Sequence, residues 1–283
     1  MSVTGPIDEV GPWTEIKVEI VEAFAKAFAT ITTAKGREYF KPVYMDGFAG
    51  GGRLLSEATG EIVAGTPLRI VDVQPPFDEY HFIEKDPRKV VALRELLGTR
   101  RGVTIHEGDS NEILLGEVLP TMTFESYRKG LLFLDPYGLD IDWRVVEAAG
   151  RSQCVDLLLN FPIMDMNMNV LKSNPDRVSA EQAARMNRFW GDESWRTECY
   201  EDQAGLFEIF RSKKPGNEAA VRAYQRRLKD VAGFQHVSTA LEMRNQEGAI
   251  LYYLIGASQK PVAVKIINDV FRRRRQGRMK QIG

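Results

Sequence analysis

The residues best suited to chemistry are an acidic side chain and the glycines that follow it. Apolar residues from Val43 to Met45 end at Asp46. The glycines that we expect to supply positive φ angles and a close approach of the backbone to a ligand are Gly47, Gly50, Gly51 and Gly52. Dinucleotide sites, phosphate loops and sites for S-adenosylmethionine (SAM) all use such a loop after a strand. Other residues must therefore decide among these ligands.

Three further acidic residues stand where other apolar stretches end. Glu84, Asp109 and Asp135 each come directly, or within three residues, after a short apolar stretch. Strands that alternate with helices imply right-handed crossovers and a parallel sheet, whose ligands bind at the carboxyl ends of the strands. We therefore expect these three residues and Asp46 to share one edge of a sheet.

The elements that must position these residues alternate along the chain at intervals of about 20 to 30 residues. Strands are expected at 43–45, 79–83, 103–106, 131–134, 155–159, 236–243 and 249–255. Helices are expected at 14–33, 68–73, 88–97, 112–119, 143–149 and 261–275. The predicted fold is Rossmann-like α/β, with a mostly parallel seven-stranded sheet and a helical insertion.

The alternation divides the chain into three regions. We expect an N-terminal helix and the ligand-binding core at 1–162, a helical insertion or cap at 163–229, and a strand pair with a basic helix that completes the core at 230–283. The insertion is where the alternation of strands and helices is lost. It would cover the substrate side of the sheet.

The choice of ligand rests on the residues that come after the glycines and after the later strands. A phosphate loop would continue with Gly-Lys-Ser or Gly-Lys-Thr, whereas Arg53 comes after Gly52. A dinucleotide gives no reason for Asp109 or for an acidic turn after the fourth strand. SAM explains all of them, because a ribose, an adenine amino group and a cationic tail each need an acceptor or a negative charge. The residues predicted to bind SAM are Asp46, Gly47, Phe48, Gly50, Gly52, Glu84, Asp109 and Ser110.

The turn Asp135-Pro136-Tyr137 resembles the Asp-Pro-Pro-Tyr motif of methyltransferases that act on a nitrogen of a base. In that motif the acid and a backbone carbonyl accept hydrogen bonds from the target amine, and the aromatic ring stacks on the base. We therefore predict Asp135, Pro136 and Tyr137 as the catalytic residues. One proline is missing from the motif, and the alternative is that Asp135 only shapes a turn.

The chain as a whole resembles the three-Cys-motif partner protein family. The segments that carry the resemblance are Pro12-Trp13, Asp46-Gly47-Phe48-Ala49-Gly50, Gly65-Thr66-Pro67, Phe82-Ile83-Glu84, Gly108-Asp109, Phe133-Leu134-Asp135-Pro136-Tyr137-Gly138 and Leu159-Asn160-Phe161-Pro162. The resemblance implies a class I methyltransferase-like fold. It also implies a partner protein with three clustered cysteines, similar to radical-SAM proteins of the phage Gp37/Gp68 type. A more distant resemblance is to ribosomal RNA adenine-N6 methyltransferases of the large subunit.

Composition limits the remaining classes of function. The net charge of −1 excludes a global attraction to nucleic acid, so such a partner would need a local patch. Two basic clusters, Arg222–Lys229 and Arg272–Arg275, are candidates for contacts with RNA or DNA, although charged helix faces are usually only solvated. Cys154 and Cys199 lack the spacing of metal ligands, and no metal site is expected. The start of the chain lacks a signal sequence, which favours a cytoplasmic location without a membrane span.

Three hypotheses remain. The first is a SAM-dependent methyltransferase that modifies a nitrogen in a nucleic-acid base. The second is an accessory partner that presents a substrate to the three-Cys protein without catalysis of its own. The third and weakest is a nicotinamide-dependent enzyme.

Overall fold

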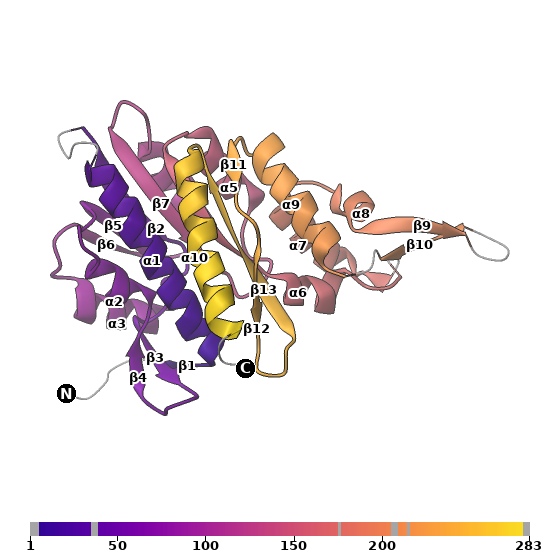
Figure 1. The fold of residues 1–283 in the computed structure, drawn as a ribbon, viewed down its shortest axis with the longest axis horizontal. Helices are drawn as coiled ribbons and strands as arrows, with labels where there is room; N and C mark the ends of the chain where they lie inside the picture. The colour runs from indigo at the N-terminus through magenta and orange to yellow at the C-terminus, as the bar shows by residue number, and fades with distance from the viewer. Residues whose placement is uncertain (1–5, 35–38, 175–176, 205–208, 214–215, 280–283) are drawn as a thin grey trace.

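A mostly parallel sheet forms the centre of the computed structural model (Figure 1), which describes residues 6–34, 39–174, 177–204, 209–213 and 216–279. Across the sheet the strands run in the order β6 (Val103–Glu107), β5 (Glu79–Glu84), β2 (Lys41–Asp46), β7 (Arg128–Leu134), β8 (Val155–Phe161) and β13 (Ile250–Ser258). The first five are parallel, and β13 is antiparallel to β8. The Rossmann-like α/β class predicted from the sequence is therefore confirmed.

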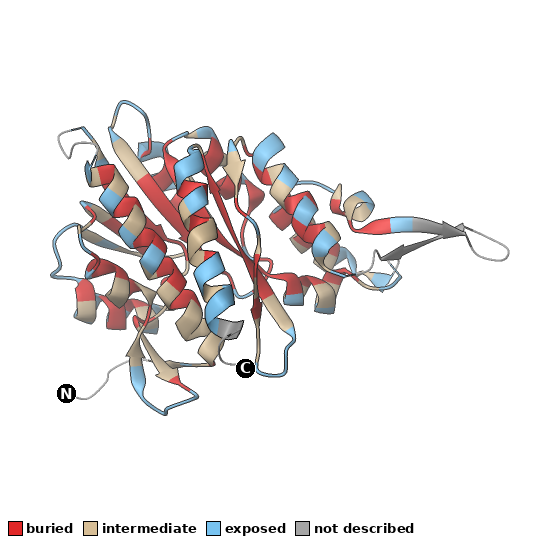
Figure 2. Ribbon diagram, in the orientation of Figure 1, coloured by how far each residue is buried: buried red, intermediate tan, exposed pale blue. Residues whose placement is uncertain are grey.

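Helices cover both faces of the sheet, and Figure 2 shows their buried sides against it. One face carries α1 (Pro12–Ala34), α2 (Thr66–Val71), α3 (Pro87–Leu97) and α10 (Pro261–Met279). The other carries α4 (Ser110–Ile113), the π-turn η1 (Leu114–Val118), the 3-10 turn η2 (Leu119–Thr121), α5 (Trp143–Arg151), α7 (Ala180–Trp190) and α9 (Glu218–Asp230). Helices α1 and α10 lie side by side on their face (Figure 1).

Side-chain alternation along β2 assigns its acidic end to one of these faces. Val43 and Met45 belong to the core under α5, whereas Tyr44 belongs to the core under α1. Successive side chains of a strand point to opposite faces, so Asp46 follows Tyr44 toward α1. Helix α1 is thus the element that covers the acidic end of β2.

The sixth expected strand, at 236–243, is split into two. Strands β11 (His236–Val237) and β12 (Leu241–Arg244) both pair with β13, so the sheet has eight strands in place of seven. Between them the hydroxyl of Ser238 accepts a hydrogen bond from the N–H of Gly256 at 2.9 Å. A side chain takes the place of a backbone carbonyl there, which interrupts the ladder.

A second small sheet follows the glycine loop, where the sequence indicated only a variable stretch. Strand β3 (Arg53–Ser56) pairs with β4 (Ile62–Ala64) and, in parallel, with β1 (Asp8–Val10) near the start of the chain. This pairing brings the N-terminal segment beside the loop. Its strands are short, and β1 pairs with a distant segment, so local patterns do not reveal them.

The insertion at 163–229 is helical only in part. It contains α6 (Ile163–Asp165), the π-turn η3 (Met166–Val170), α7, α8 (Trp195–Glu198) and most of α9, together with the hairpin of β9 (Tyr200–Ala204) and β10 (Ile209–Lys213). In Figure 1 the hairpin extends away from the sheet. Trp190, Trp195 and Tyr224 are fully buried in one cluster with residues of β8, so the insertion shares the core of the sheet.

Within the described part of the chain, the model contains no helix with the length and apolar character that crossing a bilayer requires.

Candidate functional site

Asp46 lies fully buried at the carboxyl end of β2, where the glycine loop begins. Its Oδ1 accepts a hydrogen bond from the N–H of Phe48 at 3.0 Å. The hydroxyl of Tyr44 lies 3.5 Å from its Oδ2. Gly50 and Gly52 have φ angles of +69° and +82°, as the sequence predicted. The loop is therefore folded around the acidic side chain.

Gly47 and Gly51 do not have positive φ angles, so this part of the prediction was wrong. A Cβ atom at Gly47 would lie 2.7 Å from Oγ of Ser110 and 2.8 Å from Cδ2 of Leu134. Glycine is required at this position because of close packing between β2, β7 and α4. A Cβ atom at Gly50 would meet no atom within 4 Å, so the space beside that residue is open.

Glu84, at the end of β5, is bound to the glycine loop. Its Oε2 accepts a hydrogen bond from the N–H of Gly50 at 2.9 Å. Its Oε1 accepts from the N–H groups of Lys85 and Asp86, both at 2.8 Å. The side chain of Asp86 in turn caps α3. The Glu84 carboxylate therefore holds the glycine loop and the start of α3 together.

Asp109 and Ser110 lie at the start of α4, on the next strand end. Asp109 Oδ1 accepts from the N–H of Asn111 at 2.9 Å, and its Oδ2 lies 3.6 Å from Lys85 Nζ. The hydroxyl of Ser110 is buried and has no hydrogen-bond partner among the described residues. Buried hydroxyls are normally paired, so an unpaired one packed beside Gly47 is unusual.

Asp135 lies directly after β7 and is held by two side chains from other elements. Its Oδ2 lies 2.5 Å from Nζ of Lys17 in α1, and its Oδ1 accepts from Nδ2 of Asn160, in β8, at 2.7 Å. A carboxylate can only accept here, so the amide of Asn160 must turn its nitrogen toward Asp135. The Oδ1 atom of Asn160 is then a buried acceptor with no partner in the described part of the chain.

Sequence reasoning missed Lys17. Apolar residues at helical spacing in the sequence, among them Ile16, Ala23 and Ile31, indicate one buried face for the first helix, but Ala23 is exposed and the buried stripe is turned by about one residue. That stripe contains Lys17, whose side chain is 11% exposed. Lys17 precedes the buried residues Ile20 and Val21 by three and four positions, so it lies on the same face of the helix. Charged residues are seldom buried without a partner, and this spacing was therefore the available signal for a buried ion pair.

Electrostatic interactions join these acidic groups. Burial raises the pKa of Asp46 to about 7, although the hydrogen bond from Phe48 opposes the change. The negative charges of Asp135 and Glu84 raise this pKa further, and the charge of Lys17 lowers it. Asp46, Glu84, Asp135 and Lys17 therefore lie close enough to influence one another.

Tyr137 and Pro136 differ in their environments. Pro136 is buried, whereas the Tyr137 side chain is 86% exposed, with Nζ of Lys89 at 5.9 Å from its ring centroid. The loop is anchored by Asp165 in α6, whose Oδ2 accepts from the N–H of Leu139 at 2.9 Å. The ring of Tyr137 is thus free for stacking.

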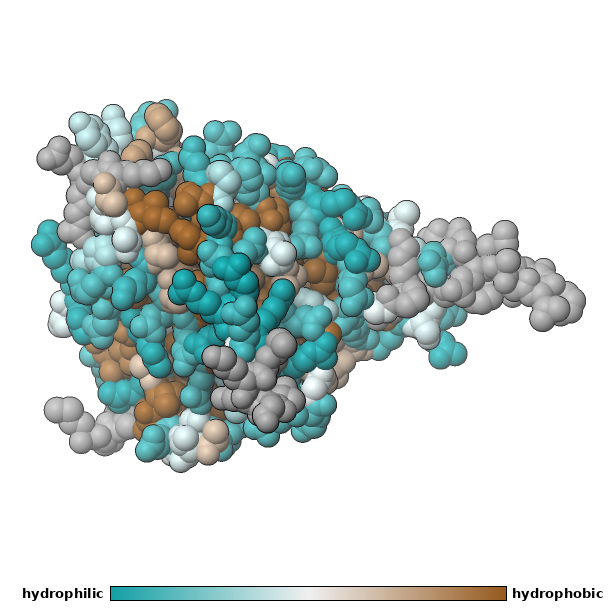
Figure 3. All heavy atoms as spheres, viewed as in Figure 1, coloured by the Kyte–Doolittle hydropathy of each residue, from teal (hydrophilic) through white to brown (hydrophobic). Residues whose placement is uncertain are grey.

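The structure also locates the two basic clusters. Within Arg222–Lys229, Arg227 is held internally, with its guanidinium 4.8 Å from the Trp143 ring and 2.9 Å from Asp192. In the other cluster, Arg272 pairs with Asp269, Arg274 with Glu19, and Arg275 donates to the carbonyl of Ala240. Hydrophilic residues gather over α10 in Figure 3. Arg273, in this helix, is exposed.

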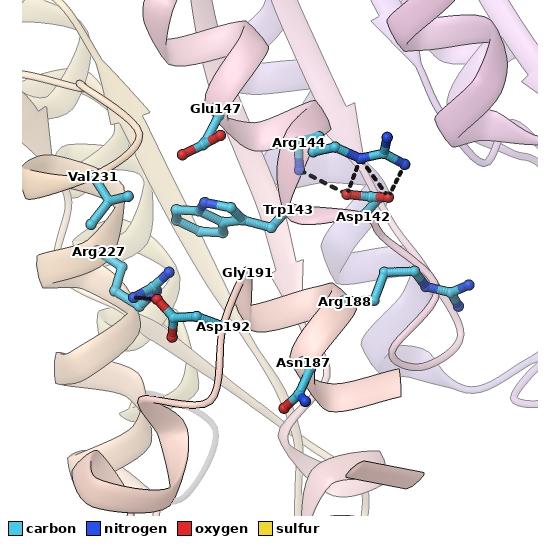
Figure 4. A pocket seen from close by; sticks show the side chains of 10 residues that line it. All are labelled: Asp142, Trp143, Arg144, Glu147, Asn187, Arg188, Gly191, Asp192, Arg227 and Val231. Carbon is cyan, nitrogen blue, oxygen red and sulfur yellow. Dashed lines mark hydrogen bonds and ion pairs between the residues drawn. The ribbon is translucent and has the colours of Figure 1, made fainter. Parts of the chain in front are cut away.

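A pocket of about 450 Å³ lies between α5, α7 and α9 (Figure 4). None of its lining residues belongs to the acidic site. Its charges largely pair with one another, as in the contacts of Asp142 with Arg144 and of Asp192 with Arg227. We assign it no ligand.

Histidines and cysteines form no metal centre in the described ranges, where no group of three or more His, Cys, Asp or Glu side chains could hold an ion. His81 Nδ1 and His106 Nε2 nevertheless lie 3.1 Å apart on β5 and β6, although they are distant in sequence. Cys154 and Cys199 are free and buried.

Three solved structures are similar to this chain at low sequence identity. Protein LPL1258 of Legionella pneumophila is similar at 10% identity over 89% of this chain and 90% of that chain, with a TM-score of 0.49. M. jannaschii TYW2 in complex with AdoMet is similar at 10% identity over 87% and 76%, with a TM-score of 0.34. Aeropyrum pernix fibrillarin with natively bound S-adenosyl-L-methionine is similar at 12% identity over 84% and 76%, with a TM-score of 0.37. No family model matches the chain, and neither does any curated protein.

Proposed function

We propose that this protein is a SAM-dependent methyltransferase that modifies a nitrogen of a nucleic-acid base. The observation that carries the proposal is that Asp46, Glu84 and Asp135 lie at the carboxyl ends of β2, β5 and β7, with Glu84 bonded to the N–H of Gly50 in the glycine loop. In this proposal Asp46 would balance the positive charge of the cofactor, and Asp135 would hold the group that accepts the methyl. Both residues lie on the side of the sheet that α1 covers.

The residues present fit the cofactor. The space beside Gly50 is open, the carboxylate of Glu84 lies at that residue, and the unpaired hydroxyl of Ser110 lies beside Gly47. Asp109, at 36% exposure of its side chain, lies at the rim where the adenine amino group would be accepted. Three successive strand ends therefore offer acceptors at the places that a nucleoside with a cationic tail requires.

When bound, SAM supplies a methyl group that is already reactive because the sulfonium is positively charged. The protein must then orient the acceptor nitrogen, and orientation supplies much of the rate in such reactions. Asp135 would accept an N–H of the target amine, and Oδ1 of Asn160 is a second acceptor nearby. The exposed ring of Tyr137 would stack on the base.

The experiment is transfer of a tritiated methyl group from SAM to total RNA and to total DNA, followed by digestion and chromatography of the nucleosides. We expect label in an N-methylated base, and a rate at least about 100-fold lower for Asp135→Asn. Asp140→Asn is the matched control, since that acid lies in the same loop but its side chain only approaches Arg185, at 4.0 Å. Absence of label from protein that binds SAM would contradict the proposal.

A second candidate is an accessory protein that belongs with a three-Cys-motif partner. This candidate is favoured because both oxygens of Asp135 already have partners. Oδ2 pairs with Lys17 and Oδ1 accepts from Asn160, so neither oxygen is free to hold a substrate in this conformation. Membership of the three-Cys-motif partner family and a cytoplasmic location remain predictions of the sequence. Co-purification with such a partner, and function of the pair that survives Asp135→Ala, would support this candidate over the methyltransferase.

A further inference from the structure

The segment that precedes the first helix lies against the glycine loop. Its strand β1 pairs in parallel with β3, which follows directly from the loop. The carbonyl oxygen of Pro6, two residues before β1, would lie 3.3 Å from a Cβ atom at Gly51, and Gly51 is buried. The segment Pro6–Val10 therefore covers the middle of the loop, one residue from the open space at Gly50.

A lysine of α3 meets the segment at the same point. A Cβ atom at Gly51 would also lie 3.8 Å from Cγ of Lys89. Nζ of Lys89 lies 2.6 Å from Oδ2 of Asp8, and the lysine side chain is only 13% exposed. Burial lowers the pKa of this lysine, but the hydrogen bond with Asp8, together with Tyr137 and Glu84, raises it by more. An ion pair thus joins β1 to α3 beside the glycine loop.

The same lysine connects the segment to the loop that follows β7. Its Nζ lies 5.9 Å from the centroid of the Tyr137 ring, within the range of a cation–π contact. One ammonium group therefore links β1, α3 and the loop that carries Asp135 and Tyr137. The three elements come from segments that are distant in the sequence.

Apart from this ion pair, little holds the segment in place. None of the residues from 6 to 10 is buried, and β1 has three residues that pair only with β3 among the described strands. Segments with few buried contacts open locally with a small free energy. The far end is fixed, because Gly11 is buried and a Cβ atom there would overlap the Trp13 ring. The segment can therefore move at Asp8 while it stays anchored at Gly11.

We propose that Pro6–Val10 is a strap that closes over the ligand at the glycine loop, with the ion pair of Asp8 and Lys89 as its latch. This inference rests on the proposed function, because it takes the loop as the site of SAM. It also gives a reason for Gly51, whose φ is not positive: a side chain there would push against Pro6.

A strap of this kind affects rates more than affinity. The ion pair has to break before the ligand enters and again before it leaves. A weaker latch raises the open fraction of both the free and the bound protein, so association and dissociation become faster together. Loss of a direct contact with the ligand would instead mainly raise the dissociation rate.

The test is stopped-flow fluorescence of the binding of S-adenosylhomocysteine. Asp8→Asn should raise both rate constants about tenfold, as expected for the loss of one charge-assisted hydrogen bond, and should change the dissociation constant by less than about threefold. Glu9→Gln, at the neighbouring exposed position of β1, is the matched control and should keep the rates of wild type.

Hydrogen–deuterium exchange of the free protein gives a readout that needs no ligand. Exchange in β1 and β3 should be about tenfold faster in Asp8→Asn than in wild type or Glu9→Gln. Unchanged exchange in β2 and β7 would show that the variant is folded. Equal exchange of β1 in all three proteins would overturn the latch.

A double variant tests whether the two residues act through one contact. Lys89→Met should match Asp8→Asn, and the two substitutions together should be no faster than either alone. Effects that add would overturn the latch. Wild-type protein that does not bind S-adenosylhomocysteine would contradict the proposed function, and this inference with it. Wild-type protein that binds it, together with an Asp8→Asn variant whose rates are unchanged or only faster in release, would overturn the strap alone.

Discussion

Nζ of Lys17 lies 2.5 Å from Oδ2 of Asp135, so the first helix of the chain is tied to the residue that comes after β7. Both side chains are largely buried, at 11% and 18% exposure. A buried ion pair adds little stability compared with apolar packing, but removal of one partner leaves a charge in a poor environment. The pair is therefore better explained by function than by stability.

This contact predicts a specific pattern of stability. Lys17→Met should lower the free energy of unfolding by about 2 kcal/mol or more, because Asp135 is left without its cation. Lys17→Met combined with Asp135→Asn should recover most of that loss. Urea unfolding followed by circular dichroism measures both, and a double variant no more stable than the single one would argue against this explanation.

The pKa of Asp46 makes stability depend on pH. Since burial raises this pKa from 3.8 to about 7, the folded protein holds a proton that the unfolded chain releases. The stabilisation is complete below about pH 4 and is lost as the pH rises through 7. Asp46→Asn is neutral at every pH, so it should raise the melting temperature by about 5 °C at pH 8 and much less at pH 4. An equal effect at both pH values would exclude a raised pKa.

Two glycines of the loop should respond differently to alanine. Gly47→Ala places a Cβ 2.7 Å from Ser110 Oγ and should destabilise by about 1–3 kcal/mol through overpacking. Gly50→Ala meets open space but has a φ of +69°, so only backbone strain of about 1–2 kcal/mol is expected. Gly47→Ala combined with Ser110→Ala should relieve only part of the first effect, because Leu134 remains. Melting curves of the three variants test this, and a Gly47→Ala protein as stable as wild type would contradict the packing.

His81 and His106 should make the protein sensitive to acid. Burial lowers the pKa of both rings, and the charge of His106 lowers that of His81 further, while Glu79 and Glu117 act in the opposite direction. Their contribution is therefore present above about pH 6.5 and is lost as the pH falls. Between pH 7 and pH 5, the free energy of unfolding should fall by about 1 kcal/mol less in His81→Gln than in wild type. Parallel losses in the two proteins would show that other groups control acid unfolding.

Much of the site could be predicted because its signals are local. Each core strand is a short apolar stretch with an acidic residue at or near its end, as at Asp46 and Asp135, and parallel strands bring such ends to one edge. The cap of α3 has a local signal too, because Asp86 stands directly before Pro87, and its side chain accepts from the N–H of Arg88. These inferences need only the order of elements along the chain.

The remaining features depend on contacts between distant segments. The phase of α1 was misjudged by about one residue, which hid Lys17, because Ile16 and Val18 flank it with similar apolar character. The pairing of β1 with β3, and the split of the last edge strand at Ser238, depend on partners that no local pattern specifies. The hydrogen bond between Asn160 and Asp135 joins two strand ends, and the sequence alone left the role of Asn160 open.

The most direct test is titration of the purified protein with SAM and, in a separate experiment, with NADH, which represents the alternative class of ligand. We expect one site for SAM, with a dissociation constant of about 1–100 µM, and at least about tenfold weaker binding for Glu84→Ala. NADH should not bind. Absence of SAM binding at millimolar concentration, or equal binding by the Glu84→Ala variant, would contradict a cofactor site built from the carboxyl ends of β2 and β5.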